Sequence, residues 1–251
     1  MSPHTDLSNR IVMVVGASRG LGRGIATAVA QAGAPVIAVA RSQTPLADLA
    51  AEADAIKVEV ADAADPVAAG VLLDRHEPDV VVLVAGATPL MRPLQQHTWE
   101  TFSANWQSDV RVAFHWLRES LLRPLARGSR VVVISSGAAL AGSPLSGGYA
   151  GAKATERFIT AYAQQEADRA GLGIRFTAVL PRLTPLTGLG RPAVKAYAAR
   201  NGQTEDEYVA AAGEPLTPGG AGAAIVELLE ADPETLAPDY LLTAAGLGVL
   251  A

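Results

Sequence analysis

Short runs of β-branched and other apolar residues alternate with longer segments of helical character, and this alternation limits the possible folds more than any other feature. The apolar runs are Ile11–Val15, Val36–Ala40, Ile56–Val60, Val80–Val84, Val131–Ser135 and Ile174–Val179. Their nearly continuous hydrophobicity is typical of strands buried on both faces of a parallel sheet. The helical segments are Gly22–Ala32, Pro45–Ala53, Pro66–Arg75, Thr98–Leu125 and Tyr149–Ala170. This order predicts βαβ units in a doubly wound α/β sheet.

The length of 251 residues suits a single α/β domain over residues 1–251. The segment Pro181–Pro218 interrupts the alternation, because prolines bracket two expected helices near Ala193–Ala199 and Glu205–Ala212. Irregular inserts of this length are usually functional, so we expect residues 182–216 to form a helical lid over a substrate site.

Composition excludes several classes of protein. With 49% hydrophobic and 18% charged residues, the chain can bury a large core and is not globally disordered. A net charge of −5, with no run of like charges, disfavours nucleic-acid and anionic-membrane partners. The chain has no cysteine, which excludes disulfides, thiolate zinc sites and cysteine nucleophiles and fits a cytoplasmic location.

The chain start and the histidines carry no sign of a membrane or metal function. The segment Met1–Arg10 is polar, and the apolar run that follows is too short for a signal sequence or a membrane span, so we expect a soluble, untargeted protein. We expect no metal site, because the histidines have no short metal-ligand spacing. They are His4, His76, His97 and His115.

A glycine-rich segment joins the first expected strand to the first expected helix. Glycines at these spacings permit a tight turn, a close approach of the backbone to a pyrophosphate, and a helix N-terminus with free N–H groups. A tight turn without a ligand would use the same glycines, but the position in an alternating chain favours dinucleotide binding and a Rossmann-type fold. The predicted cofactor contacts here are Gly16, Ser18, Arg19, Gly20, Leu21 and Gly22.

The end of the second expected strand indicates which dinucleotide is bound. A carboxylate there would bind the ribose 2′-hydroxyl and repel a 2′-phosphate, but the sequence reads Val39-Ala40-Arg41-Ser42. Arg41 offers a guanidinium suited to a phosphate, Arg19 could approach from the other side, and Ser42 could add a hydroxyl. Each arginine alone could be a solvated surface charge. The pair, with no acid present, favours NADP(H).

A serine, a tyrosine and a lysine follow the fifth expected strand. Tyr149 and Lys153 share one face of a helix, so we expect the ammonium to lower the phenol pKa from about 10 toward working pH. Such a tyrosine can donate a proton to a ketone or remove one from an alcohol. The same spacing also occurs in ordinary pairs on surface helices. Ser136, however, lies at the sheet edge that carries the glycine-rich segment.

From Ile11 to about Pro181 the chain resembles the classical short-chain dehydrogenase/reductase family. The family's GxxxGxG matches Gly16, Gly20 and Gly22, its serine matches Ser136, and its YxxxK matches Tyr149 and Lys153.

The resemblance implies roles for these residues: Tyr149 as acid/base, Ser136 orienting the substrate oxygen, and Lys153 tuning Tyr149 and binding the nicotinamide ribose. It also implies hydride transfer between nicotinamide and a carbonyl or carbinol carbon, with the protein supplying position and a proton. Further cofactor contacts are expected at Ala85, Gly86 and Pro181. Many relatives form homodimers or homotetramers through their long helices, here Thr98–Leu125 and Tyr149–Ala170.

The chain departs from the family pattern around the cofactor. Leu83-Val84-Ala85-Gly86 replaces Asn-Asn-Ala-Gly, and Val15 replaces a threonine, so side chains that brace the sheet are missing. Asp109 replaces the fourth catalytic residue, an asparagine that supports a proton relay, and it accepts hydrogen bonds only. Asn105, one turn earlier, could compensate. Pro181-Arg182 replaces Pro-Gly, so Arg182 is either a loop charge or a cofactor or substrate contact.

The leading prediction is an NADP(H)-dependent carbonyl reductase or alcohol dehydrogenase. The expected substrate is an apolar small molecule, because Leu183, Leu189 and Tyr197 are among the apolar residues of the expected lid. The alternative is a non-catalytic NADP(H)-binding sensor or scaffold, favoured by Asp109 and the missing asparagines. A sugar-nucleotide epimerase uses similar tyrosine chemistry but needs a larger C-terminal domain.

Overall fold

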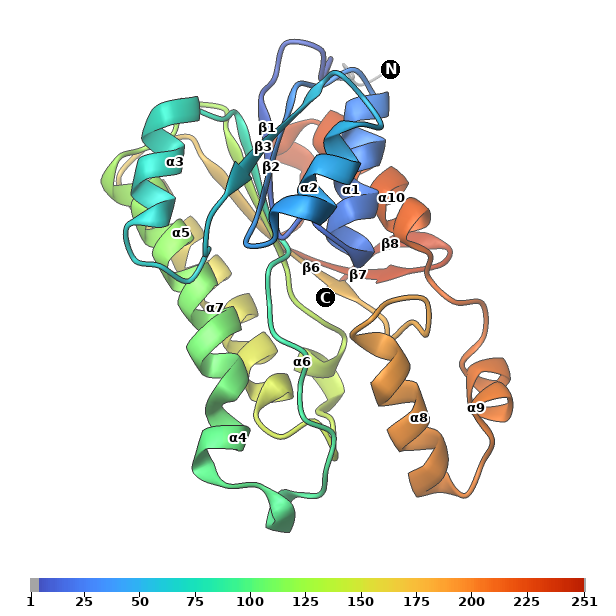
Figure 1. Ribbon diagram of the computed structural model, residues 1–251. Helices are drawn as coiled ribbons and strands as arrows, with labels where there is room; N and C mark the ends of the chain where they lie inside the picture. Colours follow the sequence, from blue (N-terminus) through green and yellow to red (C-terminus); the bar gives the residue numbers. More distant parts are fainter. Residues whose placement is uncertain (1–4, 251) are drawn as a thin grey trace.

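The computed structural model describes residues 5–250, and its centre is one eight-stranded sheet in the order β3-β2-β1-β4-β5-β6-β7-β8 (Figure 1). Strands β1 to β7 are parallel, and β8 pairs with β7 in the antiparallel sense. The strands are β1 Val12–Val15, β2 Val36–Ala40, β3 Ile56–Val60, β4 Val80–Leu83, β5 Arg130–Ile134, β6 Arg175–Pro181, β7 Asp239–Thr243 and β8 Gly246–Val249. The predicted doubly wound α/β class is confirmed.

Helices cover both faces of the sheet and extend beyond its carboxyl edge. The α-helices are α1 Gly20–Gln31, α2 Gln43–Ala50, α3 Ala68–His76, α4 Trp99–Asn105, α5 Arg111–Leu122, α6 Ala138–Ala141, α7 Tyr149–Arg169, α8 Gly190–Asn201, α9 Glu205–Ala212 and α10 Pro218–Glu230. Shorter turns are the 3₁₀ helices η1 Leu94–Gln96 and η3 Pro233–Thr235 and the π-helical turn η2 Trp106–Val110.

Strand side chains alternate between two apolar layers. Val12 and Val14 of β1 belong to the core cluster that includes residues of α1, α2 and α10, whereas Met13 and Val15 belong to the cluster of α3, α5 and α7. Figure 1 shows these two groups of helices on opposite sides of the sheet. The continuous apolar runs follow from this arrangement, because both faces of a central strand are covered.

Three parts of the chain differ from the sequence-based expectations. The expected single helix Thr98–Leu125 is α4, the π-helical turn η2 and α5 in succession. Strand β3 lies at the sheet edge, so Val58 and Val60 are exposed rather than buried on both faces. Beyond residue 181, the sheet gains β7 and β8, which the strand pattern did not predict.

The parallel strands bring their carboxyl ends to one edge of the sheet. The chain runs outward from β1 through β2 to β3 and then crosses to β4, so the strand order reverses between β1 and β4. Ligands of such sheets bind in the crevice outside this reversal point.

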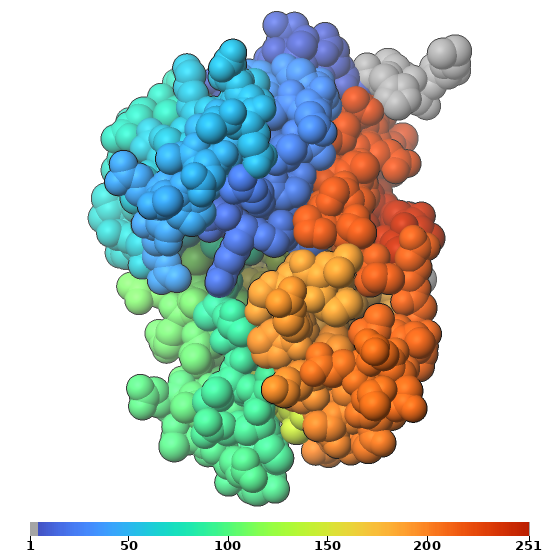
Figure 2. Space-filling model, turned by 45° about the vertical axis from the view of Figure 1, so that its right-hand side comes forward, coloured from blue at the N-terminus to red at the C-terminus, as the bar shows by residue number. Residues whose placement is uncertain are grey.

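Residues 182–216 leave the sheet after β6 and carry α8 and α9. In the space-filling view this segment, in orange, lies below the blue N-terminal part and beside the green part that includes α4 (Figure 2). Its base is closed by a buried hydrogen bond of 2.6 Å, which the Thr184 hydroxyl donates to the carbonyl of Leu216.

Candidate active site

The turn between β1 and α1 can be built only with glycine at critical positions. Gly16 and Gly20 have φ angles of 99° and 55°, in the region that disfavours other residues. A Cβ on Gly22 would lie 2.1 Å from the carbonyl oxygen of Gly16, and one on Gly16 would lie 2.6 Å from the backbone nitrogen of Ala85. The turn therefore keeps the backbone uncovered at the N-terminus of α1, as a bound pyrophosphate requires.

This turn opens into a cleft of about 1160 Å³ along the carboxyl edge of the sheet. The predicted catalytic residues Ser136, Tyr149, Lys153 and Asp109 all line the cleft. Every predicted cofactor contact also lines it, namely Gly16, Ser18, Arg19, Gly20, Leu21, Gly22, Arg41, Ser42, Ala85, Gly86, Tyr149, Lys153 and Pro181. The fold thus brings together residues that are more than 160 positions apart in the sequence.

Two arginines border the end of the cleft near β2. The side chains of Arg19 and Arg41 are exposed and, within residues 5–250, make no hydrogen bond or ion pair. Asp62, which the sequence analysis did not name, also lines the cleft just beyond β3. Its Oδ1 accepts a hydrogen bond from the backbone N–H of Ala64. This end of the cleft therefore has two positive charges, on Arg19 and Arg41, without a partner among the described residues, and one negative charge, on Asp62.

The serine, tyrosine and lysine lie where β5 meets α7. Tyr149 is the first residue of α7, and Ser136 follows β5 after one intervening residue. The Ser135 hydroxyl donates a 2.7 Å hydrogen bond to the carbonyl of Lys153, which joins β5 to α7. The Lys153 Nζ lies 5.7 Å from the centre of the Tyr149 ring, and both side chains are buried.

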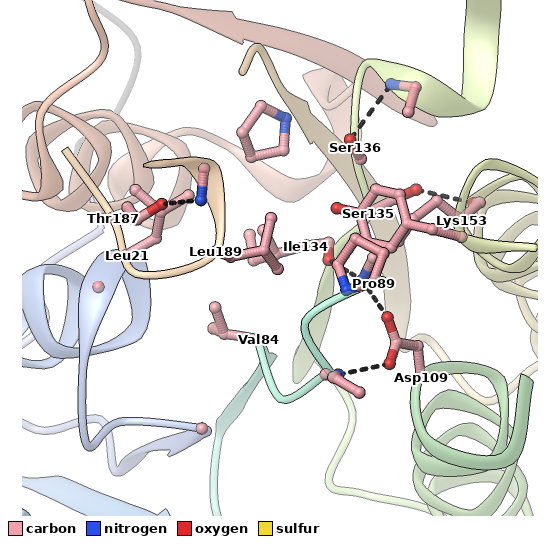
Figure 3. Close-up of a pocket in the computed structure, with 18 of the residues that line it drawn as sticks. Leu21, Val84, Pro89, Asp109, Ile134, Ser135, Ser136, Lys153, Thr187 and Leu189 are labelled. Atoms are coloured by element: carbon pink, nitrogen blue, oxygen red, sulfur yellow. Dashed lines mark hydrogen bonds and ion pairs between the residues drawn. The ribbon is translucent and has the colours of Figure 1, made fainter. Parts of the chain in front are cut away.

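Asp109 lies in the π-helical turn and is buried beside Lys153 (Figure 3). Its Oδ1 accepts hydrogen bonds from the backbone N–H of Ala87 at 2.7 Å and from the Ser108 hydroxyl at 2.6 Å. Its Oδ2 accepts one from Asn105 Nδ2 at 3.3 Å and lies 3.5 Å from Lys153 Nζ. Asn105 and Asp109 thus share the site. Single π-helical turns inside α-helices are frequent at functional sites.

Sequence reasoning missed one buried ionisable group, Glu156. Its carboxylate oxygens Oε1 and Oε2 lie 3.1 and 3.0 Å from Lys153 Nζ. Lys153, Glu156 and Thr160 are all buried on the same face of α7. Their spacing of three and four residues is the only signal that could have identified a polar stripe on this helix.

The surroundings shift the pKa values of these groups. Burial raises the pKa of Glu156 to about 7, although the Lys153 ammonium lowers it in part. Burial would lower the pKa of Lys153, but the carboxylates of Glu156 and Asp109 outweigh burial and raise it.

Burial also raises the pKa of Tyr149 above its ordinary value. Lys153 and a hydrogen bond with Ser136 lower it by less, and Asp109 and Glu156 raise it further. The expectation that Lys153 brings the Tyr149 pKa down toward working pH is therefore wrong for this structure. The Tyr149 pKa is raised because burial removes the phenolate from water and because two carboxylates, which the YxxxK pattern does not reveal, lie nearby.

The side of the cleft that includes residues of the segment 182–216 has a mixed lining. Leu183, Leu189 and Tyr197 line it as the sequence analysis expected. Tyr208 also lines it, and its ring stacks on that of Tyr197 with the ring centres 6.2 Å apart. The Tyr197 hydroxyl is hydrogen-bonded to that of Ser143. Polar residues also contribute to the lining, namely Gln107, Arg111, Arg182, Arg200 and Asn201.

Neither a metal site nor a membrane-spanning helix is found between residues 5 and 250. No group of three or more His, Asp or Glu side chains there could hold a metal ion, and His4 lies outside the described residues. No helix in the same range is both long enough and apolar enough to cross a membrane.

A comparison with protein-family models identifies the relatives of this chain. The family model described as short chain dehydrogenase matches residues 10–198, about three quarters of the chain. The chain belongs to the short-chain dehydrogenase family. The matched range includes the glycine-rich turn and the residues Ser136, Tyr149 and Lys153.

Individual relatives of this short-chain dehydrogenase are distant. The L-xylulose reductase of Mesocricetus auratus is 28% identical over 51% of this chain and 53% of that protein. The galactitol 2-dehydrogenase of Agrobacterium fabrum is 28% identical over 59% of this chain and 60% of that protein. A short-chain type dehydrogenase/reductase of Picea abies is 32% identical over 64% of this chain and 66% of that protein. The chain thus spans about half to two thirds of the length of these relatives.

Proposed function

We propose that this short-chain dehydrogenase is an NADP(H)-dependent oxidoreductase that interconverts a carbonyl group and a secondary alcohol on a small molecule. One observation carries the proposal: Ser136, Tyr149 and Lys153 line the same cleft as the glycine-rich turn of β1 and α1. Such a reaction needs a proton donor, a polar group that binds the substrate oxygen, and a dinucleotide-binding turn.

Different residues of the cleft would have different roles in cofactor binding and proton transfer. Gly16, Gly20 and Gly22 would hold the pyrophosphate of the cofactor, and Ala85, Gly86 and Pro181 would contact its nicotinamide end. The bound cofactor supplies or accepts the hydride. Ser136 orients the substrate oxygen, and Tyr149 donates or accepts its proton. Asp109 holds Lys153 and the loop at Ala87 in place.

The choice of NADP(H) rests on Arg19 and Arg41. Both line the cleft near the end of β2, where the chain has no carboxylate, and both are exposed without a polar partner inside the described part of the chain. A 2′-phosphate is the group that two such guanidinium ions bind best. The carboxylate of Asp62 reduces this attraction in part, because it lies at the end of the neighbouring strand.

The substrate is tested with carbonyl compounds of two kinds. The sequence predicts an apolar substrate, whereas the lining of the cleft is mixed and two relatives are named for L-xylulose and galactitol. The purified protein is incubated with NADPH and apolar ketones in one series and hydroxylated ketones in another. Oxidation of NADPH that depends on the ketone supports the proposal. Tight NADPH binding without turnover in either series would instead support the non-catalytic sensor or scaffold.

The segment 182–216 is proposed as the substrate lid. It carries α8 and α9, and its residues Leu183, Leu189 and Tyr197 line the cleft. The tip of the segment is the turn of residues 202–204 between α8 and α9. Deleting this tip should weaken substrate binding and leave the dissociation constant for NADPH unchanged. A loss of both would show that the segment belongs to the cofactor site.

We also propose that the chain forms a homodimer or homotetramer through α5 and α7. Phe114, Phe158 and Tyr162 of these helices are more than half exposed, and large exposed aromatic groups mark association surfaces. Sedimentation of the wild type and of Phe158→Glu tests this, because a charge at that position should release monomers. A monomeric wild type would contradict it. A cytoplasmic location stays a prediction from composition.

A further inference from the structure

Four oxygen atoms of the protein surround the ammonium group of Lys153. An ammonium has three N–H donors. Nζ of Lys153 lies 3.0 and 3.1 Å from the two oxygens of Glu156, 3.4 Å from the carbonyl oxygen of Ile134, and 3.5 Å from Oδ2 of Asp109. Protein groups therefore surround a charge that, by the family pattern, would face Tyr149 and the nicotinamide ribose.

The charge of Lys153 is divided between two carboxylates. Glu156 approaches from α7 and Asp109 from the π-helical turn η2, and the side chain of each is at most 3% exposed. In such a dry environment a positive charge that is already paired stabilises a nearby phenolate less than a free one does. With both carboxylates ionised, the group of Lys153, Asp109 and Glu156 carries a net charge of −1.

We propose that Glu156 is a positioning residue that offsets the charge of Lys153, so that the site favours proton donation by Tyr149 to a carbonyl over proton removal from an alcohol. This inference rests on the proposed function and adds the direction of the reaction, carbonyl reduction, for which the site is better suited. In the favoured direction the carbonyl carbon gains the hydride of the reduced cofactor and the carbonyl oxygen gains the Tyr149 proton. The tyrosinate that remains is reprotonated from water.

The other groups around Tyr149 do not replace this effect. The titratable groups that act on the Tyr149 ring are Lys153 and Glu156 of α7, Asp109 of η2, and the phenol of Tyr197 in α8. Strand β5 contributes the Ile134 carbonyl, and Ser135 and Ser136, which follow the strand, each contribute a neutral hydroxyl. Burial and the two carboxylates raise the Tyr149 pKa together, and of the carboxylates only Glu156 lies outside the family's motifs.

The test measures the ionisation of Tyr149 directly. Tyrosinate absorbance is titrated against pH in the wild type and in Tyr149→Phe, and the difference isolates this one phenol. The same pair of titrations is made with Glu156→Gln in both backgrounds. The absorbance change that marks ionisation of Tyr149 is called the Tyr149 step. We expect this step to move to lower pH by about one unit when the charge of Glu156 is removed. An unchanged step would overturn the inference, whether or not the protein turns over a substrate.

Two further variants separate charge from packing. Glu166→Gln makes the same substitution on the same helix at a surface ion pair with Arg169, so its Tyr149 step should match that of the wild type. Glu156→Met removes the charge with an unbranched side chain, and it should reproduce the shift of Glu156→Gln. A shift with Gln and none with Met would also overturn the inference.

The pH profiles of turnover give a second readout. In Glu156→Gln, the rising limb of kcat/KM for alcohol oxidation should move to lower pH by the same interval, while carbonyl reduction at low pH should change little. If no substrate is turned over, the proposed function fails and the absorbance titration still decides the role of Glu156.

Discussion

The Oδ1 atom of Asp109 accepts a 2.7 Å hydrogen bond from the backbone N–H of Ala87 and so joins the π-helical turn to the loop after β4. The second oxygen of the same carboxylate faces donors only, the Asn105 amide and the Lys153 ammonium. An acceptor-only side chain therefore suits this position better than the asparagine of the family pattern.

Asp109→Asn should destabilise the protein by about 1–3 kcal/mol. In either orientation, the new amide would direct its N–H groups at other donors. Urea denaturation measures the free energy of unfolding. Ser108→Ala, which removes one donor to the same carboxylate, is the control and should cost less. A variant as stable as the wild type would show that the carboxylate is not needed.

Tyr149→Phe should lower kcat on the order of 10²–10⁴-fold and leave the dissociation constant for NADPH nearly unchanged. The substitution removes the hydroxyl of the proposed proton donor and keeps the buried ring. Steady-state kinetics with the best ketone of the panel provide the measurement. Tyr162→Phe removes a hydroxyl from an exposed position of the same helix and should retain full activity. Wild-type turnover by Tyr149→Phe would refute the assignment.

The wild type should bind NADPH about tenfold to hundredfold more tightly than NADH if one arginine contacts the 2′-phosphate fully. Arg41→Asp should reverse this preference, because a carboxylate repels the phosphate and accepts hydrogen bonds from free ribose hydroxyls. Dissociation constants at low and high salt test both statements, since salt screens the contact.

The control for that experiment is Arg169→Asp. It makes the same change of charge at an exposed position of α7, away from the cleft. It should leave the ratio of the two dissociation constants unchanged. Equal affinities in the wild type would mean that Arg19 and Arg41 are ordinary surface charges.

The stability of the protein should depend on pH through Glu156. Burial raises the pKa of Glu156 to about 7, from an ordinary value of 4.5. Because the folded state holds this proton more tightly than the unfolded chain does, the resulting stabilisation is complete below about pH 4.5. It is lost as the pH rises through about 7.

The pH dependence is measured as the free energy of unfolding of the wild type minus that of Glu156→Gln. The difference should decrease between about pH 5 and about pH 8. Burial lowers the pKa of His115 and acts in the opposite sense, but it acts in both proteins and cancels. A difference that does not vary with pH would contradict the prediction.

The sequence predicted the central strands because both faces of β1, β2, β4, β5 and β6 are covered by helices. It did not predict β7 and β8, where Asp239–Thr243 is half polar and Gly246–Val249 contains two glycines. Helix α10 begins with Pro-Gly-Gly, which propensity alone does not assign to a helix. Its small residues instead let it pack closely on α1, and a Cβ on Gly222 would lie 2.4 Å from the carbonyl oxygen of Gly24.

The motifs predicted the members of the candidate site, but not their electrostatics. A glutamate on a long helix is usually solvent-facing. Glu156 is buried because the π-helical turn of residues 106–110 packs against its helix, and that turn cannot be distinguished from a regular helix in the sequence. The pKa of Tyr149 depends on this tertiary contact, which explains why the YxxxK spacing alone predicted the wrong direction.

The hydrogen bond between Thr184 and Leu216 closes the base of the segment 182–216, so the 32 positions that separate these residues form a loop whose two ends are already joined. Changing the length of such a loop costs little, because its closure entropy grows only slowly with the number of residues. The segment is therefore an exchangeable module. If the segment is the proposed substrate lid, replacing the residues between α8 and α9 should change which substrate is accepted and leave the sheet, the glycine-rich turn and Tyr149 as they are.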